Sequence, residues 1–479
     1  RRPNPRHRLF HAGGGVMASY SAFIQQKTTI SIPTGISHAD KLEYNRKMFP
    51  FQKDIVKWAL KRGRACIWSG CGTGKTIMEL EWAKHVSEFT EKPVLIFAPL
   101  AVSEQTANEE APKFGYDCRI VSSQKDIKAG INITNYEKME KFDLDKLGGV
   151  VLDEAGIIKH QAGKIRNMII DRTQNVSFRL GCTATPAPND FMEIGNHAEF
   201  VGAMKYREML SMFFVHDGGD TAKWRLKGHA KKAFFKWVAQ WAVVLRKPSD
   251  LGYSDDGFEL PELRVHQIVT ETTAQEGFLF PVEACTLQER IGARRDTVQD
   301  RVSAACRIIE KNKSDKNRLW CVWCNLNVEA DEMQKARKGM VNIQGSDSNE
   351  VKAERLLGFA RGQIEEIVSK SKIAGFGMNM QNCHNTIFLG LSDSYEQYYQ
   401  AVRRFWRFGQ KEVVNVYIVT SDIDGNVRDN IERKERDAET IYNEMVYYMK
   451  EINSENIRGS QRTVSEYQPS EKIKVPSFI

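Results

Sequence analysis

The chain has 479 residues, of which 41 % are hydrophobic and 27 % are charged, and its formal net charge is +8. This length predicts about two to four domains, and the composition supplies enough apolar side chains for their cores. No apolar run is long enough to cross a bilayer, so we expect no membrane partner. The mild positive charge is compatible with nucleic acid without being diagnostic of it.

The first sixteen residues are rich in arginine, contain no acidic residue and precede Met17. We expect residues 1–16 to be a disordered basic extension, with the protein proper beginning at Met17. A transit peptide is the weaker alternative, because Pro3 and Pro5 oppose an amphipathic helix.

A helix is predicted from about Phe49, where apolar residues between Ile55 and Leu60 recur at helical spacing. Gln52 lies near its start, shortly before a glycine-rich stretch. A glutamine amide can pair with an adenine edge, donor to acceptor and acceptor to donor. Because of its position, Gln52 is a candidate for binding adenine.

The segment Ile67–Thr76 joins an apolar run to a glycine-rich turn, and a helical pattern follows. Strand, turn and helix in this order are typical of a phosphate-binding loop, in which backbone N–H groups converge on phosphate oxygens. Lys75 would then contact the β- and γ-phosphates, and Thr76 would offer its hydroxyl to Mg²⁺. The usual pattern has Gly or Ala at the position of Ser69, which is nearly as small. The alternative is a glycine-rich turn with a surface lysine. The candidate nucleotide-binding residues of this loop are Ser69, Gly70, Cys71, Gly72, Thr73, Gly74, Lys75 and Thr76.

Strands and helices alternate after this loop. A buried strand is predicted at 93–99, ending at Pro99, and is followed by a helix to about Phe114 and short strands at 118–122 and 132–135. This alternation indicates a parallel α/β sheet.

Two adjacent acids, Asp153 and Glu154, end the next apolar strand, which begins at Gly149. A carboxylate at the carboxyl end of a parallel strand is well placed to bind Mg²⁺, and its neighbour could orient the attacking water. The alternative is a solvated acidic pair at a strand end. A further strand near 179–186 ends in Thr183 and Thr185, whose hydroxyls could link a nucleotide site to a bound polymer.

Residues 203–247 interrupt this rhythm with ten Lys or Arg against three Asp or Glu, interleaved with aromatic residues. Basic and aromatic residues together are typical of nucleic-acid binding. The alternative is a helical insertion whose aromatics form a core, and the two interpretations are compatible. The candidate nucleic-acid contacts here are Lys223, Arg225, Lys231 and Lys232.

A second α/β unit begins near Leu263, with a long helical segment to about 313 and strands at 319–324, 341–343 and 364–369. The turn at 375–381 contains Gly375 and Gly377, which allow close backbone approach. The nine cysteines are scattered, which indicates a reduced intracellular protein. Cys321 and Cys324 have C-x-x-C spacing, but no second pair completes a zinc site, so we expect core thiols.

The segment 400–410 reads Q-A-V-R-R-F-W-R-F-G-Q. Arg404 and Arg407 are three residues apart, and we expect both guanidinium groups on one face of a helix. Arginine makes bidentate contacts with a transferring phosphate and stabilises its developing charge. The alternative is an ordinary basic helix face.

In this order, the segments at Gln52, 69–76, 153–155, 183–186, 375–381 and 400–410 resemble the motifs of superfamily 2 helicases of the DEAD/DEAH type. The likeness is greatest to the Swi/Snf-like branch, and within it to compact phage and prophage helicases. It implies that Gly375 and Gly377 contact the nucleotide, and that Pro99, Asn379 and Gln381 contact nucleic acid. One departure is Gly156, which replaces a histidine that normally connects hydrolysis to the polymer site.

The resemblance implies an α/β protein with two tandem RecA-like domains, whose parallel sheets are flanked by helices, and ATP and Mg²⁺ in the cleft. We predict a basic extension (1–16), a first RecA-like domain (17–200), a helical basic insertion and linker (201–262), a second RecA-like domain (263–421) and a helical C-terminal tail (422–479). Lys75, Asp153, Glu154, Arg404 and Arg407 are the predicted catalytic residues.

The implied function is a DNA-dependent ATPase that moves along DNA, with duplex DNA as the expected partner. The alternatives are a strand-separating helicase on tailed DNA or RNA, and an ATP-gated clamp with little turnover. We expect a cytoplasmic protein of a bacterial or phage-infected cell, with phage or host replication, recombination or restriction proteins as further partners.

Overall fold

The computed structural model describes residues 35–159, 163–217, 220–270, 292, 295–314, 318–374, 378–392, 394–422 and 427–458. The predictions for residues 1–16, Gly375 and Gly377 lie outside this part of the chain. Among the described residues, no helix combines the length and the apolar character that a membrane span needs.

The first unit is built on a seven-stranded sheet of order β3-β4-β2-β5-β6-β1-β9, in which all neighbouring strands are parallel. Its strands are β1 (Arg64–Ser69), β2 (Val94–Ala98), β3 (Cys118–Ile120), β4 (Ile131–Asn135), β5 (Gly149–Asp153), β6 (Phe178–Thr183) and β9 (Ala242–Leu245). Its main helices are α2 (Pro50–Arg62), α3 (Lys75–Thr90), α4 (Leu100–Gln105), α5 (Ala111–Phe114), α6 (Lys164–Thr173) and α7 (Ile194–Val201).

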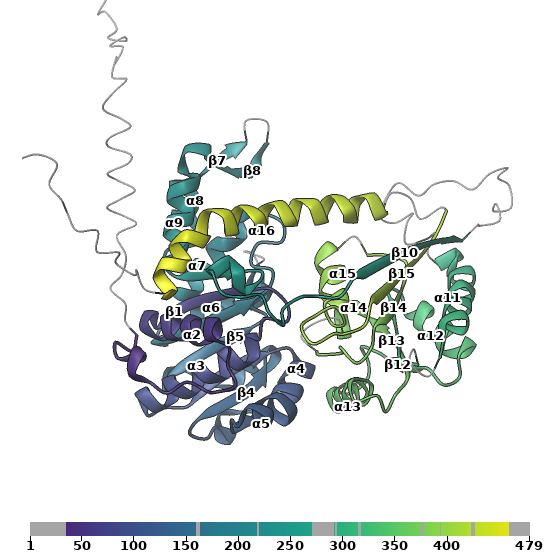
Figure 1. Ribbon diagram of the computed structural model, residues 1–479, viewed down its shortest axis with the longest axis horizontal. Helices are drawn as coiled ribbons and strands as arrows, with labels where there is room; N and C mark the ends of the chain where they lie inside the picture. The colour runs from purple at the N-terminus through teal and green to yellow at the C-terminus, as the bar shows by residue number, and fades with distance from the viewer. Residues whose placement is uncertain are drawn as a thin grey trace, which may run out of the picture.

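Helices cover both faces of this sheet, which explains why nearly all residues of its strands other than the edge strand β3 are buried (Figure 1). Cys66 and Trp68 of β1 belong to the hydrophobic core on one face, and Ala65 and Ile67 belong to the core on the other. This alternation is the period of two that a strand imposes on its side chains.

The second unit has a six-stranded parallel sheet of order β10-β15-β14-β11-β13-β12. Its strands are β10 (Leu263–Thr270), β11 (Trp320–Cys324), β12 (Val341–Ile343), β13 (Glu366–Lys370), β14 (Asn385–Leu389) and β15 (Val414–Ser421). Its helices are α11 (Val298–Asn312), α12 (Asn327–Ala336), α13 (Asn349–Ala360), α14 (Ser371–Ala374) and α15 (Tyr395–Val402). Two parallel sheets flanked by helices confirm the predicted fold class.

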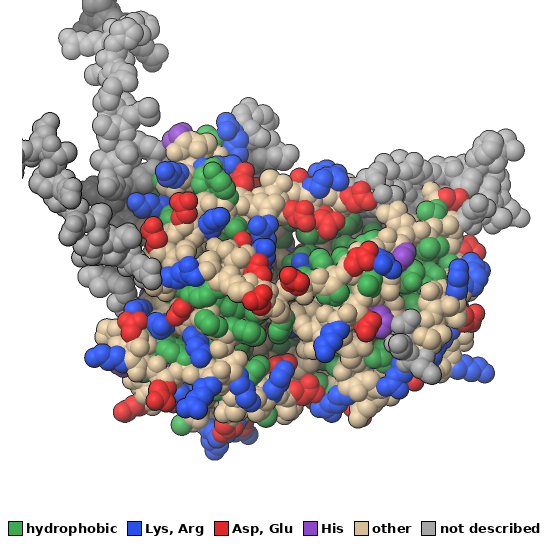
Figure 2. Space-filling model, in the orientation of Figure 1, with side chains coloured by type: hydrophobic (Ala, Val, Ile, Leu, Met, Phe, Trp, Pro, Cys, Tyr) green, Lys and Arg blue, Asp and Glu red, His purple; other side chains and the backbone are tan. Residues whose placement is uncertain are grey.

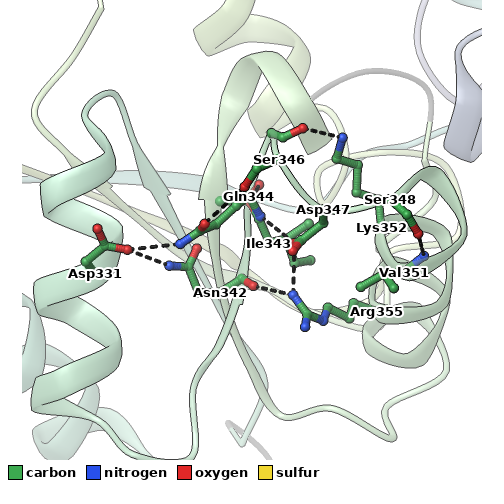
Figure 3. Close-up of polar contacts among 12 residues, drawn as sticks. Asp331, Asn342, Ile343, Gln344, Ser346, Asp347, Ser348, Val351, Lys352 and Arg355 are labelled. Carbon is green, nitrogen blue, oxygen red and sulfur yellow. Dashed lines mark hydrogen bonds and ion pairs between the residues drawn. The ribbon is translucent and has the colours of Figure 1, made fainter.

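A polar network holds the loop between β12 and α13 (Figure 3). The Arg355 guanidinium donates to the carbonyl oxygen of Asn342 at 2.8 Å and to the Asp347 carboxylate at 2.9 Å. Ser348 caps α13 by accepting from the backbone N–H of Val351. These contacts fix the start of α13, which packs against α4 of the first unit.

Residues 203–247 are not purely helical. They contain α8 (Tyr206–Phe213), β7 (Phe214–Asp217), β8 (Asp220–Leu226) and α9 (Lys231–Val238) before β9. β7 and β8 form an antiparallel hairpin, whereas β9 pairs with β1 and is an edge strand of the first sheet. β9 is stable as a strand because its apolar residues, 242–245, are buried between the sheet and the long helix that follows the second unit.

Most aromatic side chains of this segment are core residues. The fully or nearly fully buried ones are Phe213, Phe214, Phe234, Phe235, Trp237 and Trp241. They belong to the same hydrophobic core as Trp68. For these residues the alternative interpretation, that the aromatic side chains of the segment form a core, is correct.

The long helix α16 (Val427–Arg458) extends over both units (Figure 1). Its second half packs on α9, β9 and α2 of the first unit. The Tyr442 hydroxyl donates to the carbonyl oxygen of Leu245 at 2.9 Å, and lies 3.4 Å from that of Trp68. A helix after residue 422 was predicted, but its packing against the first unit was not.

Candidate nucleotide site

The loop between β1 and α3 has the conformation that its glycines were expected to allow. Gly72 and Gly74 have φ of +87° and +86°, which side chains rarely adopt. A Cβ on Gly74 would lie 2.3 Å from the Gln52 amide nitrogen, and one on Gly72 would lie 2.5 Å from the backbone nitrogen of Phe408. The loop is thus packed against α2 on one side and against the second unit on the other.

Gln52 and Lys75 are both tied to this loop. The Gln52 amide donates to the carbonyl oxygen of Thr73 at 2.8 Å, and its oxygen accepts from the backbone N–H of Phe49 at 2.9 Å. The Lys75 ammonium donates to the carbonyl oxygen of Ser69 at 3.2 Å. Gln52 therefore already links the first turn of α2 to the phosphate loop.

Asp153 and Glu154 both reach the same cavity, because the backbone turns between them. Glu154 has φ +55° and ψ +53°, a left-handed conformation that is strained for a residue other than glycine. Burial, together with the neighbouring Glu154 carboxylate, raises the pKa of Asp153 to about 7, while the Lys75 ammonium opposes this shift. A divalent cation at this carboxylate would favour its ionised form.

A cavity of about 270 Å³ lies between the two units, and the predicted catalytic residues and most of the predicted nucleotide-binding residues line it. Ser69, Gly70 and Thr73 of the phosphate loop do not line it, and Ser69 is fully buried. From the first unit the cavity is lined by Gln52, Cys71, Gly72, Gly74, Lys75, Thr76, Asp153 and Glu154. From the second unit it is lined by Asn379, Gln381, Arg403, Arg404, Arg407, Phe408 and Gly409.

The prediction that Arg404 and Arg407 lie on one face of a helix is wrong, because α15 ends at Val402. The chain continues in tight turns, in which the N–H of Arg404 bonds to the carbonyl oxygen of Ala401 and buried Phe405 holds the turn in the core. Arg404 is 3 % exposed, and its guanidinium is fixed by the backbone and side-chain oxygens of Gln400 at 2.8 and 2.7 Å. One guanidinium nitrogen lies 4.0 Å from the Glu154 carboxylate.

The residues predicted to contact nucleic acid do not all lie together. Asn379 and Gln381 line the nucleotide cavity, so a nucleotide contact fits their position better than a polymer contact. Pro99 precedes α4, Thr183 is buried at the end of β6, and the partly buried Thr185 donates its backbone N–H to the Thr183 hydroxyl at 3.1 Å.

The basic residues of 203–247 have different environments. Arg225 and Lys232 are exposed. Lys231 forms an ion pair with Glu444 of α16 at 2.8 Å, which already neutralises its charge. Lys223 lies on β8, and its side chain is outside the described part of the structure.

An aromatic cluster at the mouth of the cavity was not predicted. The rings of Phe258 and Phe408 stack with centroids 4.7 Å apart, and Phe49 meets Phe258 edge to face at 4.9 Å. Phe49 precedes the helix of Gln52, Phe258 lies between the units, and Phe408 follows Arg407, so only the fold brings them together. The segment that contains Phe258 was interpreted as a linker from its composition, and nothing in that composition predicts a contact with the other two rings.

These features define an ATPase of the phosphate-loop class whose nucleotide cleft lies between two α/β units. Two family models match the chain: "Type III restriction enzyme, res subunit" over residues 44–188 and "Helicase conserved C-terminal domain" over residues 300–409. The first match contains the phosphate loop and the paired acids, and the second contains both arginines. The chain belongs to the superfamily 2 helicases, and its domains are ATPase domains.

The chain also has more distant similarities. Protein p41 of Acyrthosiphon pisum secondary endosymbiont phage 1 is 26 % identical over 176 residues, which cover 32 % of this chain and 38 % of that protein. A fragment described as an HsdR subunit of a type I restriction enzyme from Vibrio vulnificus YJ016 has a TM-score of 0.52 at 14 % identity, covering 86 % of this chain and 70 % of that chain. This second likeness is one of fold. A Sulfolobus solfataricus SWI2/SNF2 ATPase core in complex with dsDNA has a TM-score of 0.40 at 18 % identity, covering 87 % of this chain and 98 % of that chain. The Swi/Snf-like branch stays a prediction.

Proposed function

We propose that the protein is a DNA-dependent ATPase that moves along duplex DNA. The supporting observation is the division of the nucleotide cavity, to which the first unit contributes a lysine and two carboxylates and the second contributes two arginines. Hydrolysis that needs both sets is linked to closure of the cleft. A polymer held by both units would then be displaced as the cleft closes and reopens.

The chain's own residues have distinct roles in this proposal. Lys75 and the loop N–H groups hold the phosphates, and Glu154 orients the attacking water. Arg404 and Arg407 stabilise the charge that develops on the transferred phosphate. Thr76 and Asp153 fit a Mg²⁺ ion, because both line the cavity and both offer oxygen atoms. When bound with ATP, the ion neutralises phosphate charge.

The candidate contacts with the polymer lie in two separate places on the molecule. On the face shown in Figure 2, basic and acidic side chains alternate over both units and do not form one basic stripe. The first candidates are the hydroxyls of Thr183 and Thr185, the second of which lies beside Gln400 of the second unit. The others are the exposed side chains of Arg225, on the hairpin, and Lys232, on α9. Salt dependence tests the second group directly, because each phosphate contact releases counterions.

Strand separation is a second candidate function, which the β7–β8 hairpin favours. The hairpin stands out from the body of the first unit in Figure 1. His216 and Trp224 pair across it, with ring centroids 3.7 Å apart. A projecting hairpin with an aromatic ring could act as a wedge between bases.

The deciding experiment is the steady-state ATPase rate without polymer, with single-stranded DNA, with blunt duplex DNA and with RNA. We expect duplex DNA to stimulate hydrolysis at least as much as single strands do. Lys75→Ala, in the same four conditions, gives the background. Stimulation by RNA alone, or no stimulation by any polymer, would contradict the proposal.

A further inference from the structure

Lys159 and Glu396 form an ion pair between the two units, and neither residue lines the nucleotide cavity. Glu396 lines a neighbouring cavity that also borders Gly70–Thr73 of the phosphate loop. Lys159 comes shortly after the catalytic acids, and Glu396 lies in the first turn of α15. Their side chains are only 18 % and 12 % exposed. Water and salt screen such a pair weakly, and loss of Lys159 leaves the poorly solvated Glu396 carboxylate without this counter-charge. Lys159 also lies near the Glu193 carboxylate of the first unit. The pair can therefore hold the two units together at this point.

The contacts of α15 with the first unit follow the helical repeat. Three of them occur every four residues: Glu396 with Lys159, Gln400 with the Thr185 hydroxyl at 3.5 Å and, just past the end of the helix, Arg404 with Glu154 at 4.0 Å. Tyr399, between them, contacts Cys71 of the phosphate loop. Residues four apart lie on one face of a helix. The contact of Glu396 with Lys159 thus fixes the orientation of α15, and with it the position of Arg404 relative to Glu154.

Gly156 leaves space beside this pair. A Cβ built on Gly156 would lie 3.6 Å from the Glu396 carboxylate, 3.6 Å from the Thr183 hydroxyl and 3.7 Å from the carbonyl oxygen of Thr185. A larger side chain at 156 would point into the region where Glu396 now meets the first unit. The segment after the paired acids therefore contacts the second unit through Lys159 and not through residue 156.

We propose that the Lys159–Glu396 pair is a positioning contact that sets the approach of Arg404 to Glu154 when the cleft closes. The inference rests on the proposed roles of Arg404 and Glu154 in hydrolysis. Neither member of the pair lines the nucleotide cavity, so ATP binding should be independent of it. Turnover should depend on it, because a small displacement of Arg404 weakens stabilisation of the transition state.

A double-mutant cycle tests this with Lys159→Met, Glu396→Gln and the double variant. We expect each single change to lower kcat about tenfold while KM for ATP stays within about twofold, and the double variant to lose about tenfold, not a hundredfold. Lys159→Arg, which keeps the charge, should retain most of the turnover. All rates are measured with and without duplex DNA.

The same interface offers a matched control. Arg361, just after α13, pairs with Glu109 at 2.9 Å, but the two side chains are 50 % and 30 % exposed. Because exposed pairs contribute little, Arg361→Met and Glu109→Gln should change kcat by no more than about twofold.

Several results would overturn the inference. These are single variants with wild-type kcat, losses that multiply in the double variant, an equal loss in the control pair, or a fall in kcat that only follows a lowered melting temperature. A wild-type protein no faster than Lys75→Ala would instead refute the proposed function, and with it the inference. The wild-type rate therefore distinguishes the two failures.

Discussion

Lys75 and Glu154 both line the nucleotide cavity, and their substitutions should separate binding from turnover. Lys75→Ala should abolish hydrolysis and weaken ATP binding about tenfold or more, because a charge-assisted contact with the phosphates is lost. Glu154→Gln should bind ATP normally and lower turnover by about a hundredfold or more, since the amide cannot accept a proton. Fluorescent-nucleotide titration and phosphate release measure the two effects. Wild-type turnover in Glu154→Gln would refute its assignment.

His197 should make the stability of the first unit depend on pH. It is fully buried in α7, with its ring 5.5 Å from that of Trp68, and burial lowers its pKa to about 4. The unfolded chain binds this proton more readily, so stability that is present above about pH 6.5 is lost as the pH falls towards 4, by up to about 3 kcal/mol.

Urea denaturation between pH 4 and 7 measures this loss. A His197→Asn variant, which cannot titrate, should show a shallower fall over the same range. If both proteins lose stability in parallel, His197 does not cause the acid sensitivity.

At the residue scale, the site was predictable where one short segment supplies both chemistry and geometry. The loop 69–76 and the pair Asp153–Glu154 are such segments, since a strand end fixes where the next residues point. Glu396 and Phe258 could not be assigned, because a single glutamate or phenylalanine acquires its role only from a partner in the other unit.

At the element scale, a buried ion pair joins α11 to α12 in the second unit. Arg301 and Glu329 are both fully buried, 2.7 Å apart, and Glu329 also accepts from the backbone N–H groups of Asn325 and Leu326. Arg301→Met should cost about 3–5 kcal/mol, because it leaves a buried carboxylate without its counter-charge. A double variant, Arg301→Met with Glu329→Met, should recover part of this loss. Urea midpoints followed by circular dichroism report both, and equal midpoints for the two variants would contradict this account.

The elements that were missed share a physical cause. β9 lies in a segment interpreted as an insertion, and β14 and β15 were not predicted. All three are short strands of four to eight residues that contain several apolar side chains. Short apolar runs do not reveal which sheet they join. The end of α15 at Val402 was likewise hidden, because tertiary contacts of Phe405 and Arg404 override a sequence that continues with helical spacing.

At the scale of the whole molecule, the basic segment should contribute to polymer binding through its exposed side chains. Replacing Arg225 and Lys232 with alanine should reduce the slope of log K against log salt on duplex DNA by about 1.8, since each phosphate contact contributes about 0.9. Lys231→Ala is the matched control and should leave the slope unchanged, because Glu444 already pairs with Lys231. Binding titrations over a range of salt measure the slopes. An unchanged slope in the double variant would make this segment purely structural.

The remaining choice is between movement along duplex DNA and separation of its strands. Both functions use the same cleft, so ATP hydrolysis alone cannot distinguish them. They differ in the β7–β8 hairpin, which strand separation would use as a wedge and movement along a duplex would not require. We predict that the protein displaces a triplex-forming third strand without unwinding a blunt duplex. Shortening the hairpin between His216 and Trp224 should leave triplex displacement within about twofold, since the nucleotide cavity and both arginines lie elsewhere. Efficient unwinding of a tailed duplex, lost when the hairpin is shortened, together with stimulation of the ATPase by single strands alone, would refute the translocase function and establish the helicase.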